Sequence, residues 1–133
     1  MDADLARIVQ ELSSENVVRR CAAAERLAQR GEEAAAACVA LVRACGDSDE
    51  VRDWAASALE SCGAPPLTAL DELASLTTHE QLDVAYWAAT LIGRLGPQAA
   101  AATPQLIKCA SGSEHESVRR RASWALERIR RSR

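Results

Sequence analysis

The two histidines are the residues best suited to chemistry, since imidazole can bind metals or transfer protons near neutral pH. Each is followed by a glutamate, in His79-Glu80 and His115-Glu116, and both side chains are common metal ligands. Both glutamates also end an S/T-x-x-E pattern, which is typical of a capping box at the start of a helix. We therefore interpret the two pairs as helix starts and predict no metal site.

The cysteines offer a second possible chemistry. They are Cys21, Cys38, Cys45, Cys62 and Cys109, with no CxxC pair among them. Cys38, Cys45 and Cys62 occupy positions where the helical pattern places small apolar residues, which is typical of buried thiols in a reducing cytoplasm. Ser/His/Asp, Cys/His and paired-carboxylate arrangements are missing, and so is a Gly-rich phosphate loop. We predict no enzyme activity and no cofactor.

Charge is unevenly distributed along the chain. Residues 1–114 carry 9 Lys+Arg and 17 Asp+Glu, a net charge of −8, whereas residues 115–133 carry 7 Arg and 2 Glu, a net charge of +5. The Arg-rich end could contact phosphates, but the acidic residues before it oppose binding to nucleic acid. Arginines are also favourable at a helix C-terminus, so we favour a solvated terminal helix and keep nucleic-acid binding as an alternative.

Composition predicts that these residues lie on helices. Phe is absent, Gly and Pro number only 6 and 4, and strong helix formers dominate. No apolar run approaches the length of about 18 residues that a membrane span needs. The acidic start, Met1-Asp2-Ala3-Asp4, is not typical of a signal peptide. We expect a cytoplasmic protein without a membrane partner.

One helical motif recurs along the chain. The pattern V-R-x-x-A-A-x-A-L-x-x-x-G runs from Val51 to Gly63, and its skeleton returns at 84–96 and 118–129. Its first valines, Val51, Val84 and Val118, are 33 and 34 residues apart. The helices between them repeat too, with apolar pairs predicted to face inward: Ile8-Val9, Leu41-Val42, Leu73-Ala74 and Leu106-Ile107. The spacing predicts one domain, 1–133, of four stacked helical hairpins and about eight helices: 1–31, 32–63, 64–96 and 97–133.

Glycines and prolines indicate where the helices end. Gly31, Gly63 and Gly96 each follow a second helix, as a left-handed stop residue does. Pro104 lies within the helix that Pro97 begins, so we expect a kink or a two-piece helix there. The first repeat fits the motif only if one residue is inserted near 19–22.

The motif, with Gly46-Asp47-Ser48-Asp49 before it, resembles the short HEAT-like repeat of phycobilin lyase-type and other bacterial proteins. The ankyrin and tetratricopeptide signatures do not occur. The resemblance covers all 133 residues and implies an all-α, right-handed α-solenoid of four two-helix repeats, whose second helices line a concave surface. HEAT-type deoxyhypusine hydroxylases bind di-iron through His-Glu pairs inside that helix. Here the pairs precede Val84 and Val118 by five and three residues, so the likeness does not extend to a metal.

A helical wheel of the repeated helix separates a core stripe from an outer surface. The core stripe, at positions 1, 5, 8, 9 and 12, is Val51, Ala55, Ala58, Leu59, Cys62; Val84, Ala88, Leu91, Ile92, Leu95; and Val118, Ala122, Ala125, Leu126, Ile129. The opposite positions 3, 7 and 10 provide the predicted partner-binding residues, Asp53, Tyr86, Thr90, Arg120 and Trp124. An outward Tyr and Trp beside Arg is typical of a protein-binding hot spot. Alternatively, Trp124 packs over a neighbouring helix.

Position 4 of the same helix lies on its flank, where repeats touch. It holds Cys21, Trp54, Trp87 and then Arg121, which predicts Trp54 and Trp87 at the seams and a polar cap at the last repeat. A capped end predicts a monomer or a weak dimer. The sequence therefore favours a non-catalytic scaffold that binds a protein or peptide on its concave surface. The alternatives are a phycobilin lyase-like enzyme or chaperone subunit, and nucleic-acid binding through the Arg-rich end.

Overall fold

The computed structural model describes residues 1–131, and these residues form helices and no strands, which confirms the all-helical class. By contacts the chain divides into two compact units, Met1–Gly63 and Ala64–Arg133. The division falls between the second and third predicted repeats. Each unit is described by itself.

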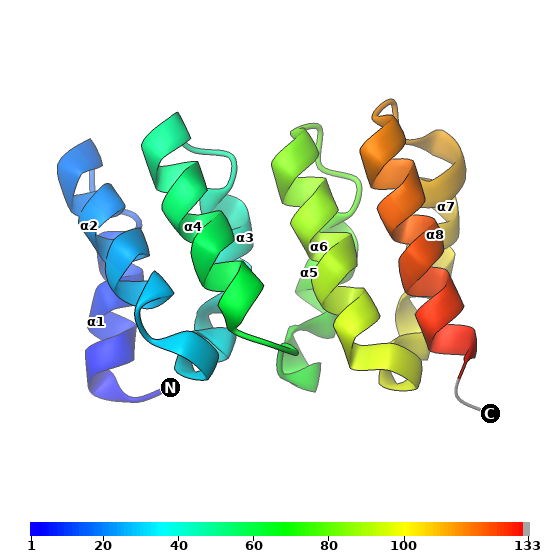
Figure 1. The fold of residues 1–133 in the computed structure, drawn as a ribbon, viewed down its shortest axis with the longest axis horizontal. Coiled ribbons are helices and arrows are strands. Elements are labelled where there is room, and N and C mark those ends of the chain that lie inside the picture. The colour runs from blue at the N-terminus through cyan, green and yellow to red at the C-terminus, as the bar shows by residue number, and fades with distance from the viewer. Residues whose placement is uncertain (132–133) are drawn as a thin grey trace. The chain divides into compact units, whose positions relative to one another are not determined.

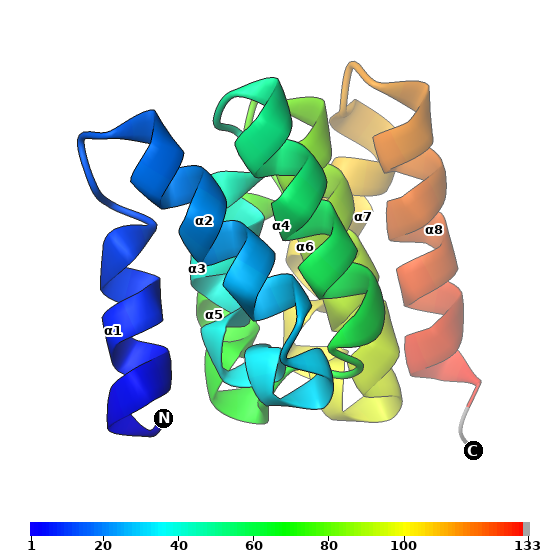
Figure 2. The same ribbon diagram turned by 60° about the vertical axis from the view of Figure 1, so that its left-hand side comes forward.

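The first unit contains two helical hairpins. Its elements are α1 (Ala3–Glu11), α2 (Val17–Ala28), the 3₁₀ helix η1 (Gly31–Ala37), α3 (Cys38–Ala44) and α4 (Asp49–Ser61). α2 packs alongside α4, while α1 and α3 pack against α2 and α4, respectively (Figure 1). Figure 2 shows α1 and α2 as an antiparallel pair. Leu5, Leu27, Leu41 and Leu59 are buried between these helices.

The second unit repeats this arrangement. Its elements are the 3₁₀ helix η2 (Leu67–Ala69), α5 (Leu70–Leu76), α6 (Leu82–Leu95), the 3₁₀ helix η3 (Gly96–Ala102), α7 (Thr103–Gly112) and α8 (Glu116–Arg130). α6 packs alongside α8, α5 packs on α6, and α7 packs on α8 (Figure 1). Leu73, Leu91, Ile92 and Leu106 are fully buried in its core.

The predicted helix ends at glycine are confirmed. Gly31, Gly63 and Gly96 have φ values of +59°, +76° and +62°, in the left-handed region that favours glycine. The segment around Pro104 is also in two pieces, since η3 ends at Ala102 and α7 begins at Thr103. Proline suits this place because the first residues of a helix need no N–H partner within it.

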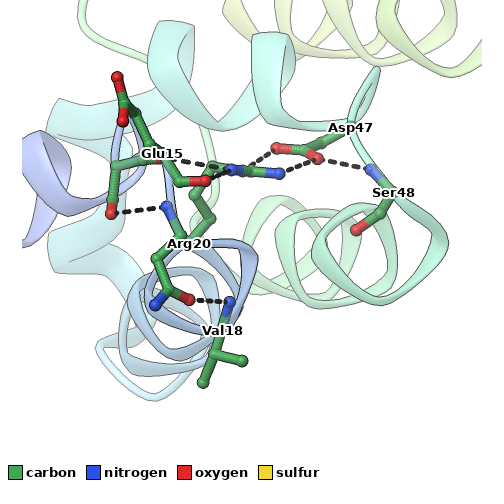
Figure 3. Close-up of polar contacts among 7 residues, drawn as sticks. Glu15, Val18, Arg20, Asp47 and Ser48 are labelled. Carbon is green, nitrogen blue, oxygen red and sulfur yellow. Dashed lines mark hydrogen bonds and ion pairs between the residues drawn. The ribbon is translucent and has the colours of Figure 1, made fainter.

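Arg20 connects two turns of the first unit (Figure 3). Its Nε and Nη2 donate to the carboxylate of Asp47 at 2.8 and 3.2 Å, and its Nη1 donates to the carbonyls of Ser14 and Glu15. Burial raises the pKa of Asp47, but the hydrogen bonds from Arg20 and from the Ser48 N–H, with the Arg20 charge, lower it below its usual value overall. The bidentate ion pair therefore fixes the α1–α2 turn to the α3–α4 turn.

Arg119 makes the corresponding contact in the second unit. Its Nη1 donates to the carbonyl of Ser113, six residues earlier, just as Arg20 donates to Ser14. Arg20 and Arg119 are 99 residues apart, which is three periods of 33. Arg20, rather than Arg19, therefore corresponds to the arginine of the motif, in agreement with an inserted residue near this point. Val18 is 72% exposed and lies outside the core stripe.

Two local predictions were wrong. Neither S/T-x-x-E pattern forms a capping box, because α6 begins only at Leu82 and α8 begins at Glu116 itself. Thr77 is buried at the end of α5 and donates to the Ala74 carbonyl, while Ser113 Oγ accepts from the His115 N–H. In 103–112 the predicted inward position of Leu106 is confirmed but that of Ile107 is incorrect, because α7 buries Leu106 and Cys109 and leaves Ile107 55% exposed.

Candidate partner-binding site

Where α6 and α8 pack together, aromatic and arginine side chains stack in alternation, one of them from α6 and three from α8. The Arg121 guanidinium lies over the rings of Tyr86 and Trp124, with its Cζ 4.8 and 4.7 Å from their centroids. Its Nη2 also donates to the Tyr86 hydroxyl at 2.6 Å. On Trp124, a second guanidinium, that of Arg128, lies 5.4 Å from the ring centroid. These four side chains, Tyr86, Arg121, Trp124 and Arg128, are called the arginine–aromatic stack below.

The absence of a side chain at Gly93 allows this stack to form. A Cβ placed on Gly93 would overlap the six-membered ring of Trp124, so the indole lies directly against α6. Arg128 Nε then donates to the Gly93 carbonyl at 2.8 Å. Cation–π contacts contribute about 0.5–2 kcal/mol each, depending on exposure, so together they favour this arrangement of the four side chains.

The stack borders two shallow depressions. The first, of about 380 Å³, is lined by Tyr86, Glu116, Ser117, Arg120, Arg121 and Trp124. The second, of about 390 Å³, shares Arg120 and Trp124 with the first and is otherwise lined by Ser123, Glu127, Arg128 and Arg131. At the rim, Arg120 is exposed and pairs with Glu116, at 2.8 Å. Indole and phenol surface, arginine N–H groups and the carboxylates of Glu116 and Glu127 thus line these two adjoining depressions.

Three of the five predicted partner-binding residues lie at this place. Tyr86, Arg120 and Trp124 line the first depression, with Tyr86 and Trp124 half-buried. Trp124 packs over Gly93, as the second interpretation of the sequence has it, and its side chain also lines both depressions, so its role in binding a partner stays a prediction. Asp53 belongs to the first unit, where it is exposed on α4 and pairs with Arg52 at 3.3 Å.

The prediction for Thr90 is corrected. Its side chain is buried, 6% exposed, and its hydroxyl donates to the Tyr86 carbonyl at 2.8 Å. The helical wheel assumes one buried stripe, but α6 packs against α5, α8 and η3 within its own unit. A helix packed on several sides has no free opposite face, so Thr90 cannot offer its hydroxyl to a partner.

Arg121 is the main residue that the sequence interpretation missed. It was expected to cap an open end, yet it points back to Tyr86 on the preceding second helix. The reason is its pair of aromatic neighbours, which stabilise a guanidinium better than the open flank of α8 does. The signal was the spacing: Arg121 follows Tyr86, and Arg128 follows Gly93, by 35 residues. This is one residue more than the step from Val84 to Val118.

The histidines lie at a separate hollow of about 440 Å³, between the turn before α6 and the turn before α8. His79 Nδ1 accepts from the Gln81 N–H, and His115 Nε2 lies 3.3 Å from the Glu80 carbonyl oxygen. Within residues 1–131 no three His, Cys, Asp or Glu side chains are grouped as a metal site requires. His79 thus stabilises its own turn, whereas His115 joins the turn before α8 to the turn before α6.

Four of the five cysteines are buried, namely Cys38, Cys45, Cys62 and Cys109, as the sequence predicts for three of them. Burial raises the pKa of the Cys109 thiol. The Cys21 thiol is partly exposed and donates to Glu50 at 3.4 Å. Desolvation, then the hydrogen bond and the negative charge of Glu50, raise its pKa. A raised pKa disfavours the nucleophilic thiolate at both sites.

No protein-family model matches the chain, and no curated protein matches it. Among solved structures, the chain is similar to the crystal structure of an engineered protein, with a TM-score of 0.60 and 24% identity over 97% of this chain. The match spans 63% of that protein's chain. At this identity the likeness concerns the fold alone. Among the helices within residues 1–131, none combines the length and apolar character that crossing a membrane requires.

Proposed function

We propose that this chain is a non-catalytic scaffold of short HEAT-like repeats that binds a protein or peptide on the surface of its second helices. The repeat spacing of 33 and 34 residues supports a solenoid of four such hairpins. The buried cysteines are compatible with a reducing compartment, the cytoplasm. In this proposal the arginine–aromatic stack and the two depressions beside it form the contact surface.

The observation that carries the proposal is the combination of aromatic and arginine side chains at the depression beside Tyr86 and Trp124. Tyr, Trp and Arg are the residues that most often dominate binding energy at protein interfaces. Here the two rings and Arg121 hold one another in place through contacts within 5 Å. A partner therefore meets side chains that are already ordered, and loses less entropy on binding.

The test is affinity capture from the source cells with the intact chain, comparing proteins recovered by the wild type and by single variants. Tyr86→Ala and Trp124→Ala should each lose the recovered partner, because each removes a ring from the depression. Ile107→Ala is the matched control, since Ile107 is a large apolar side chain 55% exposed on α7 of the same unit and lines neither depression. Thermal unfolding checks that each variant is folded. Equal recovery by all four proteins would contradict this choice of surface.

Nucleic-acid binding is a second candidate, favoured by the arginines that α8 presents beside the depressions. Such binding weakens steeply with salt, because each phosphate contact releases counterions. For a DNA or RNA duplex, the logarithm of the association constant would then fall with the logarithm of the salt concentration, with a slope of several units. Absence of measurable binding at about 50 mM salt would eliminate this candidate.

A further inference from the structure

We infer that the partner of this site is an acidic peptide, whose Asp or Glu carboxylates bind the guanidinium groups of Arg120 and Arg121. The inference rests on the proposed function and adds the chemical class of the partner. The helix that forms the site, α8, carries five Arg and two Glu, so its net charge is +3. An acidic segment is electrostatically complementary to it, and this complementarity favours both the encounter and the orientation of the partner.

Arg121 is prepared for a carboxylate. A guanidinium has five N–H donors in one plane, of which Nη2 already donates to the Tyr86 hydroxyl. The rings of Tyr86 and Trp124 hold its position without using further donors, since they contact it through their π systems. The remaining N–H groups point from the edge of a fixed plane, the geometry that pairs with the two oxygens of a carboxylate.

Arg120 already holds a carboxylate of this chain. Its Nη2 lies 2.8 Å from Glu116, and the two side chains are 78% and 66% exposed. An exposed pair of this kind is weak, so a carboxylate from a partner can replace Glu116. The pair also shows that a carboxylate fits the rim of the depression.

The stack favours a peptide over single-stranded nucleic acid. Proteins that bind single strands use aromatic faces as platforms for bases. Here Arg121 covers the Tyr86 ring, and Arg121 and Arg128 both lie over the Trp124 ring. Faces that carry guanidinium groups are not free for bases, whereas the N–H groups of Arg121 other than the one bonded to Tyr86 can still donate to an anion.

The experiment selects random 12-residue peptides by phage display on the full chain, so that no partner needs to be known. Peptides recovered on the wild type should be enriched in Asp and Glu relative to the starting library. For one selected peptide, Arg121→Gln and Arg120→Gln should weaken binding about 10- to 100-fold. Glu116→Gln should strengthen it by up to about fivefold, because a competing carboxylate is removed.

Arg130→Gln is the control, since it removes one exposed charge from α8 away from both depressions. It should change the affinity less than about twofold. An equal loss in Arg130→Gln and Arg121→Gln would overturn the inference, because the effect would then be one of total charge. If thermal melting shows that the Arg121→Gln protein is not folded, the loss of peptide binding in Arg120→Gln tests the inference instead, because Arg120 is exposed at the rim.

Other outcomes separate this inference from the proposed function. If the selected peptides bind at Tyr86 and Trp124 but are not enriched in Asp and Glu, the inference of an acidic partner is overturned, while the proposed scaffold function is retained. No peptide above background, together with unchanged protein capture by Tyr86→Ala and Trp124→Ala, would overturn both. Tighter binding of a 12-nucleotide oligothymidylate, or self-association in sedimentation that Arg121→Gln abolishes, would assign the site to nucleic acid or to a second copy.

Discussion

Gly93 determines how closely Trp124 approaches α6, and through Trp124 it determines where two arginines lie. The indole occupies the space that a side chain at this position would take. A glycine inside a helix costs about 1 kcal/mol relative to alanine. At Gly93 this cost is offset by contacts of Trp124 and by the hydrogen bond from Arg128.

Gly93→Ala is therefore predicted to be destabilising despite the better helix propensity of alanine. Overpacking costs about 1–3 kcal/mol, and the close overlap with the Trp124 ring places Gly93 at the upper end of this range, so after subtracting the gain in propensity of about 1 kcal/mol we expect a net loss of up to about 2 kcal/mol. Gly112→Ala is the control: Gly112 ends α7 with no atom within 4 Å of an added Cβ and should be neutral or slightly stabilised. Urea unfolding measures both. A Gly93→Ala protein as stable as the wild type would show that Trp124 moves away without cost.

At this scale the sequence predicted which residue types matter but not always where they point. Tyr86, Arg120 and Trp124, at the outward positions of the helical wheel, do lie at one depression, and that they bind a partner stays a prediction. Thr90 and Arg121 were misplaced because a single helical wheel contains no information about the neighbouring helix. The direction of a long side chain depends on what the next helix offers it.

Among the elements, the contact of Arg20 with Asp47 connects turns that belong to different hairpins of the first unit. The two side chains are 22% and 23% exposed, so water screens the pair only in part. Hydrogen bonds to charged groups contribute about 1.5–3 kcal/mol, more than an exposed ion pair does. The register of the two hairpins therefore depends measurably on Asp47.

The lowered pKa of Asp47 predicts a dependence of stability on pH. Because the folded carboxyl binds protons more weakly than the unfolded one, its contribution is fully present above the unfolded pKa, about 3.9. It is lost as the pH falls through the folded pKa. Asp47→Asn should reduce the free energy of unfolding at pH 7 by about 1.5 kcal/mol and flatten its decrease between about pH 5 and 2.

Urea unfolding across this pH range makes the measurement. Glu60→Gln is the comparison variant, since it removes one exposed carboxylate from the same unit and corrects for the general change in charge. An Asp47→Asn protein whose stability decreases as steeply in acid as that of the wild type would contradict the role given to the pair.

Element boundaries were largely predictable from glycine and proline, because these residues act on their own backbone. The 3₁₀ segments η1 and η3 were not predicted, although both begin at a glycine that ends a helix. Both are rich in alanine, as in Gly31–Ala37 and Gly96–Ala102, which fits α-helix and 3₁₀ helix alike. The tighter winding is decided by how the hairpin closes, which is a tertiary effect.

At the scale of the whole molecule, labelling of the buried cysteines measures whether each unit unfolds cooperatively. Cys38, Cys45 and Cys62 share the first core with 1–2% exposure, and Cys109 is in the second with 3%. Iodoacetamide labelling in increasing urea, read by peptide mass, should show one common midpoint for the first three, because they share one core. Cys109 should follow the midpoint of its own unit. Labelling of Cys38 well before Cys62 would show that the hairpins of the first unit unfold separately.

The overall class was predictable because composition and periodicity agree, and four hairpins of similar length divide evenly into two units. The function was not predictable to the same degree. A repeat motif is fixed by stacking, whereas Tyr86, Arg121 and Trp124 form their site only once two helices lie side by side.

The three glycines that follow the second helices occupy a backbone conformation that suits D-amino acids better than L-amino acids. An added Cβ at Gly31, Gly63 or Gly96 meets no atom within 4 Å, so space does not exclude a side chain there. Only the positive φ does, and it penalises L-residues because of their handedness. A D-alanine has no such penalty, so at these points the protein prefers the mirror image of the residues that form its helices.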